Sequence, residues 1–520
     1  MNNSRRNFIK TTGISTFGAS LIPTIGPLAD ILKINNSQAL LRTSPESQAV
    51  SSAGISQFVA AANASGLGWH SFMLLRHGNV IAEAWWQPFE PGFKHTLYSL
   101  SKSFTSTAIG LLVKEGKLNV EDKLLSFFPE DAPAAPGNYL QQMKVKHLLT
   151  MNTGHGEDTM GKMRASTSTW TKAFLALPVT FEPGTHFLYN TGATYMLGAI
   201  VHKITGQTLT EYLGPRLFEP LDIKGYDWET SPQGLNTAGY GLRIKTEDIA
   251  KFGQMYLQNG KWNGKEILTE AWVNDATKYQ TSSQEGDGDW AQGYGYQFWR
   301  CKPGFYRGDG AFGQFCIVMP QHDAVLAITS ESFNMQKSMT TVWENLLPAI
   351  KTGNLPEDKT ALQVLKKDLA ALQLPVVKSS ISSPLASKYD GKKIKLDSNE
   401  FGLNEMQIKF SKDGCSLSAN GTKGSSTLKF GWENWVTGKE TVPYIFPVAG
   451  RFQMPSKMAG TATWINDNTL QLNARFVEAM HGDKITCSFD GDKVSVTFLN
   501  SVSENSKTDS DKRVPLKGTI

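Results

Sequence analysis

Hydrophobic periodicity changes character late in this chain of 520 residues, and this change constrains the fold more than any other feature. Up to about residue 350, helical patterns alternate with short apolar strands, whereas from Ile394 onwards apolar and polar residues alternate between turn residues. A period of two places every second side chain on the same face of a strand. The chain is also too long for one ordinary domain. We therefore expect two folded units of different class.

The first unit, residues 53–350, has strand patterns at both ends and helical patterns between them. Residues 71–76 and 80–86 flank His77-Gly78-Asn79 and predict a hairpin. Further strands are expected at 293–299, 313–319 and 324–329, and helices at 99–115, 145–150, 193–205, 246–259 and 335–350. Strands at the start and the end of the unit predict one antiparallel sheet flanked by helices, with a helical insertion beside it. The expected class is α+β, with a cleft between the sheet and the insertion.

The second unit, residues 384–502, consists of short alternating segments separated by turn residues. The predicted strands include 406–410, 415–418, 461–465, 469–473, 484–489 and 493–498. This pattern favours a small all-β sandwich or barrel. We interpret the polar, Lys-rich residues 351–383 as a linker and residues 503–520 as a flexible tail. The sequence does not indicate a role for this unit.

The N-terminal segment Ser4-Arg5-Arg6-Asn7-Phe8-Ile9-Lys10 and the mildly apolar residues 11–29 resemble a twin-arginine export signal. We assign residues 1–33 to this signal and 34–52 to a linker, and we expect a periplasmic or other extracytoplasmic location. Gly and Pro interrupt the apolar part, which is shorter than the roughly 20 residues of a spanning helix, so no stable membrane anchor is expected. In an oxidising compartment the four cysteines permit disulfides, Cys415 with Cys487 or Cys301 with Cys316, and four free thiols are the alternative.

Composition and motifs exclude several classes of function. The formal net charge is only +5, charged residues make up 19% of the chain, and no Lys/Arg-rich run is interleaved with aromatic residues. The chain has no zinc-finger, P-loop or dinucleotide-binding pattern. We therefore expect no nucleic-acid partner, no metal and no organic cofactor.

The chemistry is indicated by Ser99-Leu100-Ser101-Lys102 at the start of an apolar helical pattern. Residues three apart share a helix face, so the Lys102 amine can approach the Ser99 hydroxyl. A serine hydroxyl is a weak nucleophile and needs a base, and a lysine whose pKa is lowered by burial can supply it. The same spacing at Ser426-Thr427-Leu428-Lys429 lies in a predicted strand, where alternation separates the two side chains.

Residues 98–118 resemble the nucleophile helix of serine β-lactamases, penicillin-binding proteins and related esterases and amidases. The resemblance extends over the whole first unit and implies a β-lactamase/transpeptidase-like fold, with Ser99 as nucleophile and Lys102 as base. Phe187-Leu188-Tyr189-Asn190-Thr191 resembles the second motif of this family, which makes Tyr189 the third catalytic group. Asn190 directly follows the tyrosine here, whereas the common form is Tyr-x-Asn, and both Asn190 and Thr191 are assigned to substrate binding.

The third family motif, Lys-Thr-Gly or His-x-Gly, is matched best by Gly308-Asp309-Gly310. The resemblance then implies an oxyanion hole made by the N–H groups of Ser99 and Ala311. Asp309, Gly310 and Gln314 are assigned to substrate binding. Glycine stands where the family has a cation that holds the carboxylate of a β-lactam, and Asp309 would repel that carboxylate. Arg307 could replace the missing charge.

Together these motifs predict a serine hydrolase that cleaves amide or ester bonds through an acyl-enzyme on Ser99. Its substrate is expected to be a small ester, an amide or a D-amino-acid peptide rather than a β-lactam. A true β-lactamase or DD-carboxypeptidase is one alternative. The other is a non-catalytic protein that binds cell-wall peptides and retains the penicillin-binding fold.

Overall fold

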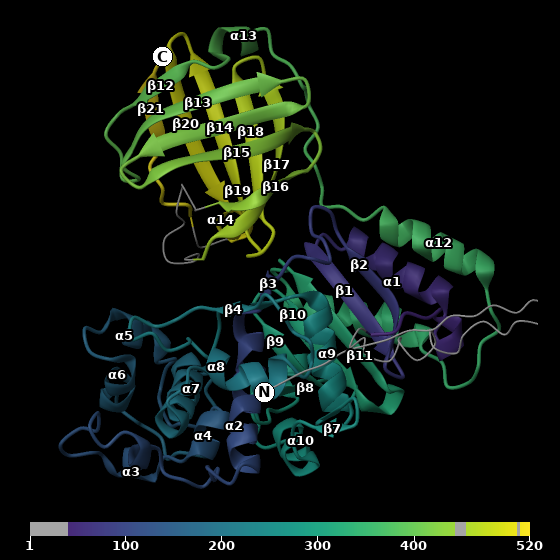
Figure 1. Cartoon of the computed structure of the whole chain (residues 1–520), viewed down its shortest axis with the longest axis vertical. Coiled ribbons are helices and arrows are strands. Elements are labelled where there is room, and N and C mark those ends of the chain that lie inside the picture. The colour runs from purple at the N-terminus through teal and green to yellow at the C-terminus, as the bar shows by residue number, and fades with distance from the viewer. Residues whose placement is uncertain (1–39, 443–453, 507–509) are drawn as a thin grey trace, which may run out of the picture. The chain divides into compact units, whose positions relative to one another are not determined.

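A computed structural model describes residues 40–442, 454–506 and 510–520, so the predicted export signal lies outside the described residues. An α+β domain comes first in the chain and an all-β domain follows (Figure 1). Within the described ranges, no helix has both the length and the apolar character needed to cross a membrane.

The α+β domain is built on a six-stranded antiparallel sheet in the order β2-β1-β11-β10-β9-β8. Its strands are β1 Trp69–Arg76, β2 Asn79–Trp85, β8 Trp299–Arg300, β9 Tyr306–Gly310, β10 Gln314–Met319 and β11 Ala324–Ser330. The first and last parts of the domain meet where β1 pairs with β11, with Phe72 opposite Ile328. The predicted hairpin is present as β1 and β2. The predicted strand at 293–299 is wrong except for Trp299, and β9 was not predicted.

Helices cover both faces of this sheet, so β1 is buried along its whole length. Phe72 and Leu74 belong to one hydrophobic core, and Met73 and Leu75 belong to the other. The core that contains Met73 also includes residues of α2 Ser101–Lys114, α4 Val145–Leu149, α7 Thr191–Thr205 and α9 Thr246–Leu257. The opposite core is closed by α1 Ser52–Ala64, α11 Met335–Thr341 and α12 Lys359–Ala370.

Short elements complete the α+β domain. The helices are α3 Asn138–Gln142, α5 Met160–Ala165, α6 Trp170–Ala176, α8 Leu209–Leu213 and α10 Glu270–Thr277. The strands are β3 His95–Thr96, β4 Asp227–Trp228, β5 Leu242–Ile244, β6 Lys261–Trp262 and β7 Lys265–Glu266. β3, β5 and β4 form a small sheet of their own, and Lys94 and Arg243 both pair with Asp227 on it.

The all-β domain is a closed barrel, which decides between the two predicted forms. Nine described strands close it, because β15 pairs with β17 as well as with β14. They are β12 Lys393–Leu396, β13 Leu403–Ser411, β14 Gly414–Gly421, β15 Gly424–Trp432, β17 Ser456–Asn466, β18 Thr469–Phe476, β19 Gly482–Asp490, β20 Lys493–Asn500 and β21 Leu516–Thr519. A further strand, β16 Val436–Val442, pairs with β17, and α13 Ala386–Tyr389 and α14 Ser501–Asn505 flank the barrel.

Two segments interpreted as linker and tail are structured. Residues 351–383 contain α12, which lies beside α1 (Figure 1) and buries Leu365. The last residues form β21, which pairs with β12 and β20 and thereby closes the barrel. Arg513, in the expected tail, is paired with Asp483 and Asp511.

The predicted disulfides are wrong, because all four cysteines are buried free thiols. Cys301 and Cys316 belong to hydrophobic cores on opposite faces of the sheet, which keeps their sulfur atoms apart. Cys415 lies on β14 and Cys487 on β19, strands that are not neighbours in the barrel. Burial raises the pKa of the Cys487 thiol to about 12.

Candidate active site

Ser99 lies in a tight 3₁₀ turn, Tyr98–Leu100, that leads into α2. The α-helix begins at Ser101, so the prediction that Ser99 belongs to its first α-helical turn is wrong by two residues. Tyr98, directly before Ser99, has a left-handed backbone with φ of 48°. The side chain of Ser99 is half-buried, whereas nearly all of α2 is buried. Amides at the start of a helix have no partner within it, and the Ser99 N–H occupies such a position.

The side chain of Lys102 places an amine beside the hydroxyl of Ser99. Its Nζ lies 3.0 Å from Ser99 Oγ and 3.5 Å from Thr191 Oγ1, and it donates a hydrogen bond to Gly239 O at 2.8 Å. The side chain is only 1% exposed. Burial lowers the pKa of Lys102 to about 7, although the negative charges of Asp158 and Asp309 oppose the shift. A large fraction of the amine is therefore neutral at neutral pH and can accept a proton.

Tyr189 lies beside the same two groups. The Nζ of Lys102 is 4.8 Å from the centre of its ring, and Ser99 is close enough to the Tyr189 hydroxyl to act on its pKa. The ring stacks on Trp299 with centroids 5.5 Å apart. Burial and the charge of Asp309 raise the pKa of Tyr189 well above its ordinary value, so the hydroxyl keeps its proton at neutral pH.

β9 passes so close to the nucleophile turn that only glycine fits at two of its positions. A Cβ at Gly310 would lie 2.0 Å from Leu97 O, and a Cβ at Gly308 would lie 2.5 Å from Leu100 Cδ1 and 2.6 Å from Ser103 Oγ. Position 308 therefore faces α2 and has no room for a cation. The interpretation of Gly308 as a lost carboxylate-binding position is corrected to a packing requirement. This close approach also brings Ala311, which follows β9, next to the nucleophile turn.

Asp309 of the third motif and the preceding Arg307 form an ion pair in the interior. Arg307 Nε donates to Asp309 Oδ2 at 2.9 Å, and the two side chains are 0% and 5% exposed. Arg307 also donates to Arg300 O at 2.8 Å and lies over the ring of Trp290. The expectations that Asp309 faces the substrate and that Arg307 can swing into the cleft are therefore wrong.

The other predicted substrate-binding residues divide into two groups. Thr191 lines the cleft that contains Ser99. Asn190 is fully buried, where its side-chain oxygen caps α7 through Gly192 N and accepts from Thr159 Oγ1 at 2.7 Å. Gln314 is also fully buried and donates to Ser330 O at 2.7 Å and Ala311 O at 3.1 Å. The structure therefore places Asn190 and Gln314 behind the site, where they support its loops.

A cleft of about 770 Å³ opens beside Ser99. Its walls include Arg164, Trp170, Glu229 and Tyr240, none of which stands in a motif of the sequence. Glu229 is half-buried and forms no salt bridge with any residue of the described ranges. Burial raises its pKa, while the charges of Arg243 and Arg164 oppose the shift. Arg164 lies on α5, Trp170 begins α6, and Glu229 and Tyr240 lie in loops. None of these segments carries a recognisable motif, so sequence patterns could not have found them.

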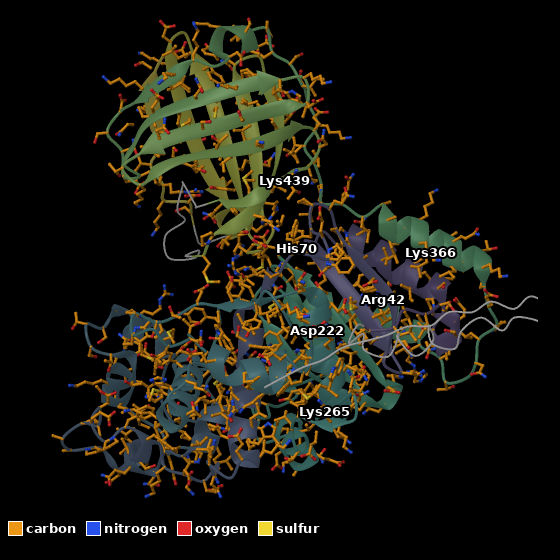
Figure 2. The ribbon with its side chains drawn as sticks, viewed as in Figure 1. Arg42, His70, Asp222, Lys265, Lys366 and Lys439 are labelled. Atoms are coloured by element: carbon orange, nitrogen blue, oxygen red, sulfur yellow. The ribbon has the colours of Figure 1, made fainter. Side chains whose placement is uncertain are left out.

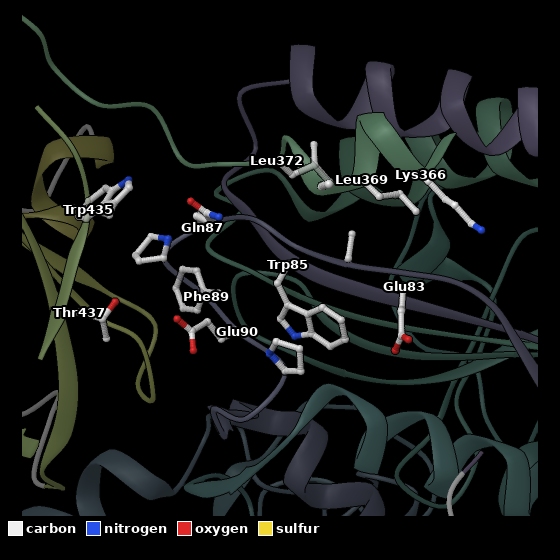
Figure 3. Close-up of a pocket in the computed structure, with 14 residues that line it drawn as sticks. Glu83, Trp85, Gln87, Phe89, Glu90, Lys366, Leu369, Leu372, Trp435 and Thr437 are labelled. Carbon is white, nitrogen blue, oxygen red and sulfur yellow. The ribbon is translucent and has the colours of Figure 1, made fainter. Parts of the chain in front are cut away.

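A second pocket, of about 580 Å³, is lined by residues of β2, α12 and β16 and contains none of the proposed catalytic residues (Figure 3). Trp85, Phe89 and Lys366 lie on its walls. Over the ranges that the structure describes, no group of His, Cys, Asp and Glu side chains could hold a metal ion.

The model of the beta-lactamase family matches residues 55–350, more than half of the chain. The chain belongs to this family, and it is accordingly a serine hydrolase of the β-lactamase fold, as the motifs predicted. The barrel lies outside the matched residues.

Among curated proteins, the 6-aminohexanoate-dimer hydrolase of Paenarthrobacter ureafaciens is 26% identical over 49% of this chain and 71% of its own length. The beta-lactamase of Escherichia coli K12 is 23% identical over 41% of this chain and 61% of its own length. Similar solved structures include a penicillin-binding protein homologue from Caulobacter crescentus, which is 17% identical over 59% of this chain and 98% of that chain, with a TM-score of 0.48. The octameric penicillin-binding protein homologue from Pyrococcus abyssi is 16% identical over 89% of this chain and 99% of that chain, with a TM-score of 0.46.

Proposed function

We propose that the protein hydrolyses amide or ester bonds of small substrates through an acyl-enzyme on Ser99. The observation that carries this proposal is the distance of 3.0 Å between Lys102 Nζ and Ser99 Oγ, at a buried amine whose pKa is about 7. A base with a pKa near the working pH transfers protons most effectively. The neutral amine takes the hydroxyl proton as Ser99 Oγ attacks the carbonyl carbon.

The neighbouring groups complete the sequence of steps. The N–H groups of Ser99 and Ala311 stabilise the oxyanion of the tetrahedral intermediate. The Tyr189 hydroxyl is protonated at neutral pH before the reaction. It donates this proton to the leaving amine or alkoxide and regains one from the Lys102 ammonium. Water then attacks the acyl carbon, with the same groups removing its proton, and this step releases the acid and restores Ser99.

The walls of the cleft support a linear amide or ester, or a short D-amino-acid peptide, rather than a β-lactam. Glu229 can pair with an ammonium group of the substrate, and Arg164 can pair with a carboxylate. A small amide that carries both groups satisfies both residues, whereas a β-lactam without an amine leaves Glu229 unpaired. The name of the Paenarthrobacter relative denotes hydrolysis of such a linear amide by that protein.

Labelling with a fluorophosphonate tests the nucleophile. Intact mass should show one adduct, which Ser99→Ala abolishes. Ser101→Ala is the matched control, because it removes the other hydroxyl of the motif and should still be labelled. Lys102→Ala and Tyr189→Phe should each lower kcat by about 10²-fold or more while the thermal unfolding midpoint changes little. An unlabelled wild-type protein would support a non-catalytic peptide binder instead.

Substrate class is tested by comparing kcat/KM for a D-amino-acid anilide, a short nitrophenyl ester and a chromogenic cephalosporin. Glu229→Gln should lower kcat/KM for the amine-bearing anilide by about 10-fold and leave the neutral ester nearly unchanged. If the cephalosporin is hydrolysed fastest, the preference for linear substrates is wrong.

A further inference from the structure

The barrel reaches the candidate active site through residues 477–481, which join β18 to β19 and are called the interface loop below. The loop contacts the α+β domain through its backbone, because Thr96 N donates to Ala479 O at 3.2 Å. It also makes side-chain contacts: Met480 Sδ lies 3.3 Å from Gln314 Nε2, and His481 is 1% exposed. A segment of the second domain is therefore buried against the residues that surround Ser99.

His481 is held at both ring nitrogens. Its Nδ1 lies 2.6 Å from Glu331 Oε1, and its Nε2 lies 2.8 Å from the Tyr98 hydroxyl. Glu331 follows β11 and also accepts hydrogen bonds from Arg475 on β18 and from Ser501, the first residue of α14. Burial alone would raise the pKa of Glu331, but Arg475 and His481 lower it to about 2, so the carboxylate is ionised. Hydrogen bonds at both ring nitrogens therefore fix the orientation of the imidazole between Glu331 and Tyr98.

The loop contacts the backbone on both sides of the proposed oxyanion hole. Tyr98 precedes Ser99, Phe312 follows Ala311, and both have left-handed backbones, with φ of 48° and 65°. The His481 ring packs edge-on against both rings, with centroids 6.0 Å from Tyr98 and 4.8 Å from Phe312. Left-handed conformations of bulky residues are unfavourable and persist only where the surroundings hold them.

We infer that the barrel is part of the catalytic unit, and that His481, supported by Glu331, is a positioning residue that fixes Tyr98 and Phe312 and thereby orients the N–H groups of Ser99 and Ala311. This inference rests on the proposed function. It assigns a role to a domain for which the sequence indicates none. Tyr98 and Phe312 also line the cleft, so the barrel shapes the wall that receives the substrate.

The test measures ester hydrolysis and the rate of fluorophosphonate labelling at Ser99 in the full chain. His481→Ala should lower kcat and the labelling rate by about 10- to 100-fold, with a smaller change in KM, because misplaced oxyanion donors affect the transition state more than binding. His481→Gln, which retains a polar atom near the place of Nε2, should recover part of the loss. Glu478→Gln is the matched control in the same loop, because that carboxylate faces the amide of Lys457 and should leave both rates unchanged.

Tyr98→Phe keeps the ring and removes only the hydroxyl, so it tests the contact even if His481→Ala fails to fold. It should lower kcat by about 3- to 10-fold, as expected for one lost buried hydrogen bond. The double variant with His481→Gln should then lose less than the product of the two single effects. Wild-type rates in Tyr98→Phe and His481→Gln would overturn the inference. A wild-type protein that is not labelled at Ser99 would instead overturn the proposed function.

Discussion

Lys102 and Tyr189 occupy the same buried site, and burial separates their roles. Desolvation disfavours the charged form of each group, which lowers the pKa of the amine and raises the pKa of the phenol. Near neutral pH the neutral lysine can therefore accept a proton. The protonated tyrosine can donate a proton and must then regain one from another group. Because burial moves the two pKa values in opposite directions, we assign Lys102 as the base and Tyr189 as the proton donor.

The pH dependence of kcat/KM for an uncharged ester should report the ionisation of Lys102. Only the neutral amine acts as base, so kcat/KM should rise as pH increases through about 7, the pKa to which burial lowers this group. Below that pH, kcat/KM should fall by about 10-fold per pH unit. Tyr189→Phe should lower the rate and keep the inflection, whereas Lys102→Ala should lose it. A wild-type profile that stays flat between about pH 5.5 and 8 would contradict the role of Lys102.

At the scale of elements, close packing rather than propensity determines several local structures. β9 contains Gly308 and Gly310, which weaken a strand pattern, yet the strand forms because its backbone packs against the nucleophile turn. Residues 359–370 are mostly exposed and polar, but the helix they form covers α1 with one apolar stripe. The sequence patterns do not predict these two elements, because the segments against which they pack are distant in the sequence.

Leu365 is the buried residue of α12, and its truncation tests whether this helix belongs to the folded domain. Leu365→Ala should lower the free energy of unfolding by about 2–4 kcal/mol, because it removes a side chain that is only 2% exposed. Val364→Ala is the matched control, since Val364 is 50% exposed and should change stability by less than about 0.5 kcal/mol. Urea unfolding of both variants gives the comparison. Equal midpoints would show that α12 adds nothing to stability.

At the scale of the whole molecule, buried histidines lie where the two domains meet. His70, on β1 and labelled in Figure 2, has its Nδ1 2.9 Å from Nε2 of His95. Burial lowers the pKa of His95 to about 4 and that of His70 well below its ordinary value. Neutral histidines in the folded protein become protonated when the chain unfolds in mild acid.

The stability of the protein should therefore fall between about pH 6.5 and pH 4. In this window His95 binds a proton in the unfolded chain but not in the folded protein. The free energy of unfolding therefore decreases as pH falls. The loss from His95 alone should reach about 2 kcal/mol at pH 5, and below about pH 4.5 the protonation of Glu331 in the unfolded chain adds to it. His95→Gln should flatten the pH dependence, whereas His77→Gln, at an exposed turn, should not. Equal slopes in the two variants, measured by urea unfolding at pH 7 and pH 5, would contradict this account.

The sequence by itself was sufficient for features that depend on local spacing. Ser99 and Lys102 are three residues apart at a helix start, Tyr189 lies in a recognisable motif, and strict alternation defines most barrel strands. The predicted fold class and family are confirmed, because both rest on such patterns. Export through the N-terminal signal stays a prediction, since those residues lie outside the described ranges.

Only the tertiary structure decided how charges and domains meet around Ser99. The pairing of Asp309 with Arg307, the free cysteines on opposite sides of a sheet, and the contact between Tyr98 and His481 all join groups whose spacing in the sequence carries no signal of contact. The pKa of Lys102 likewise depends on burial by residues from many segments. Long-range packing sets desolvation and charge pairing, and these two effects determine the chemistry that a local motif can only suggest.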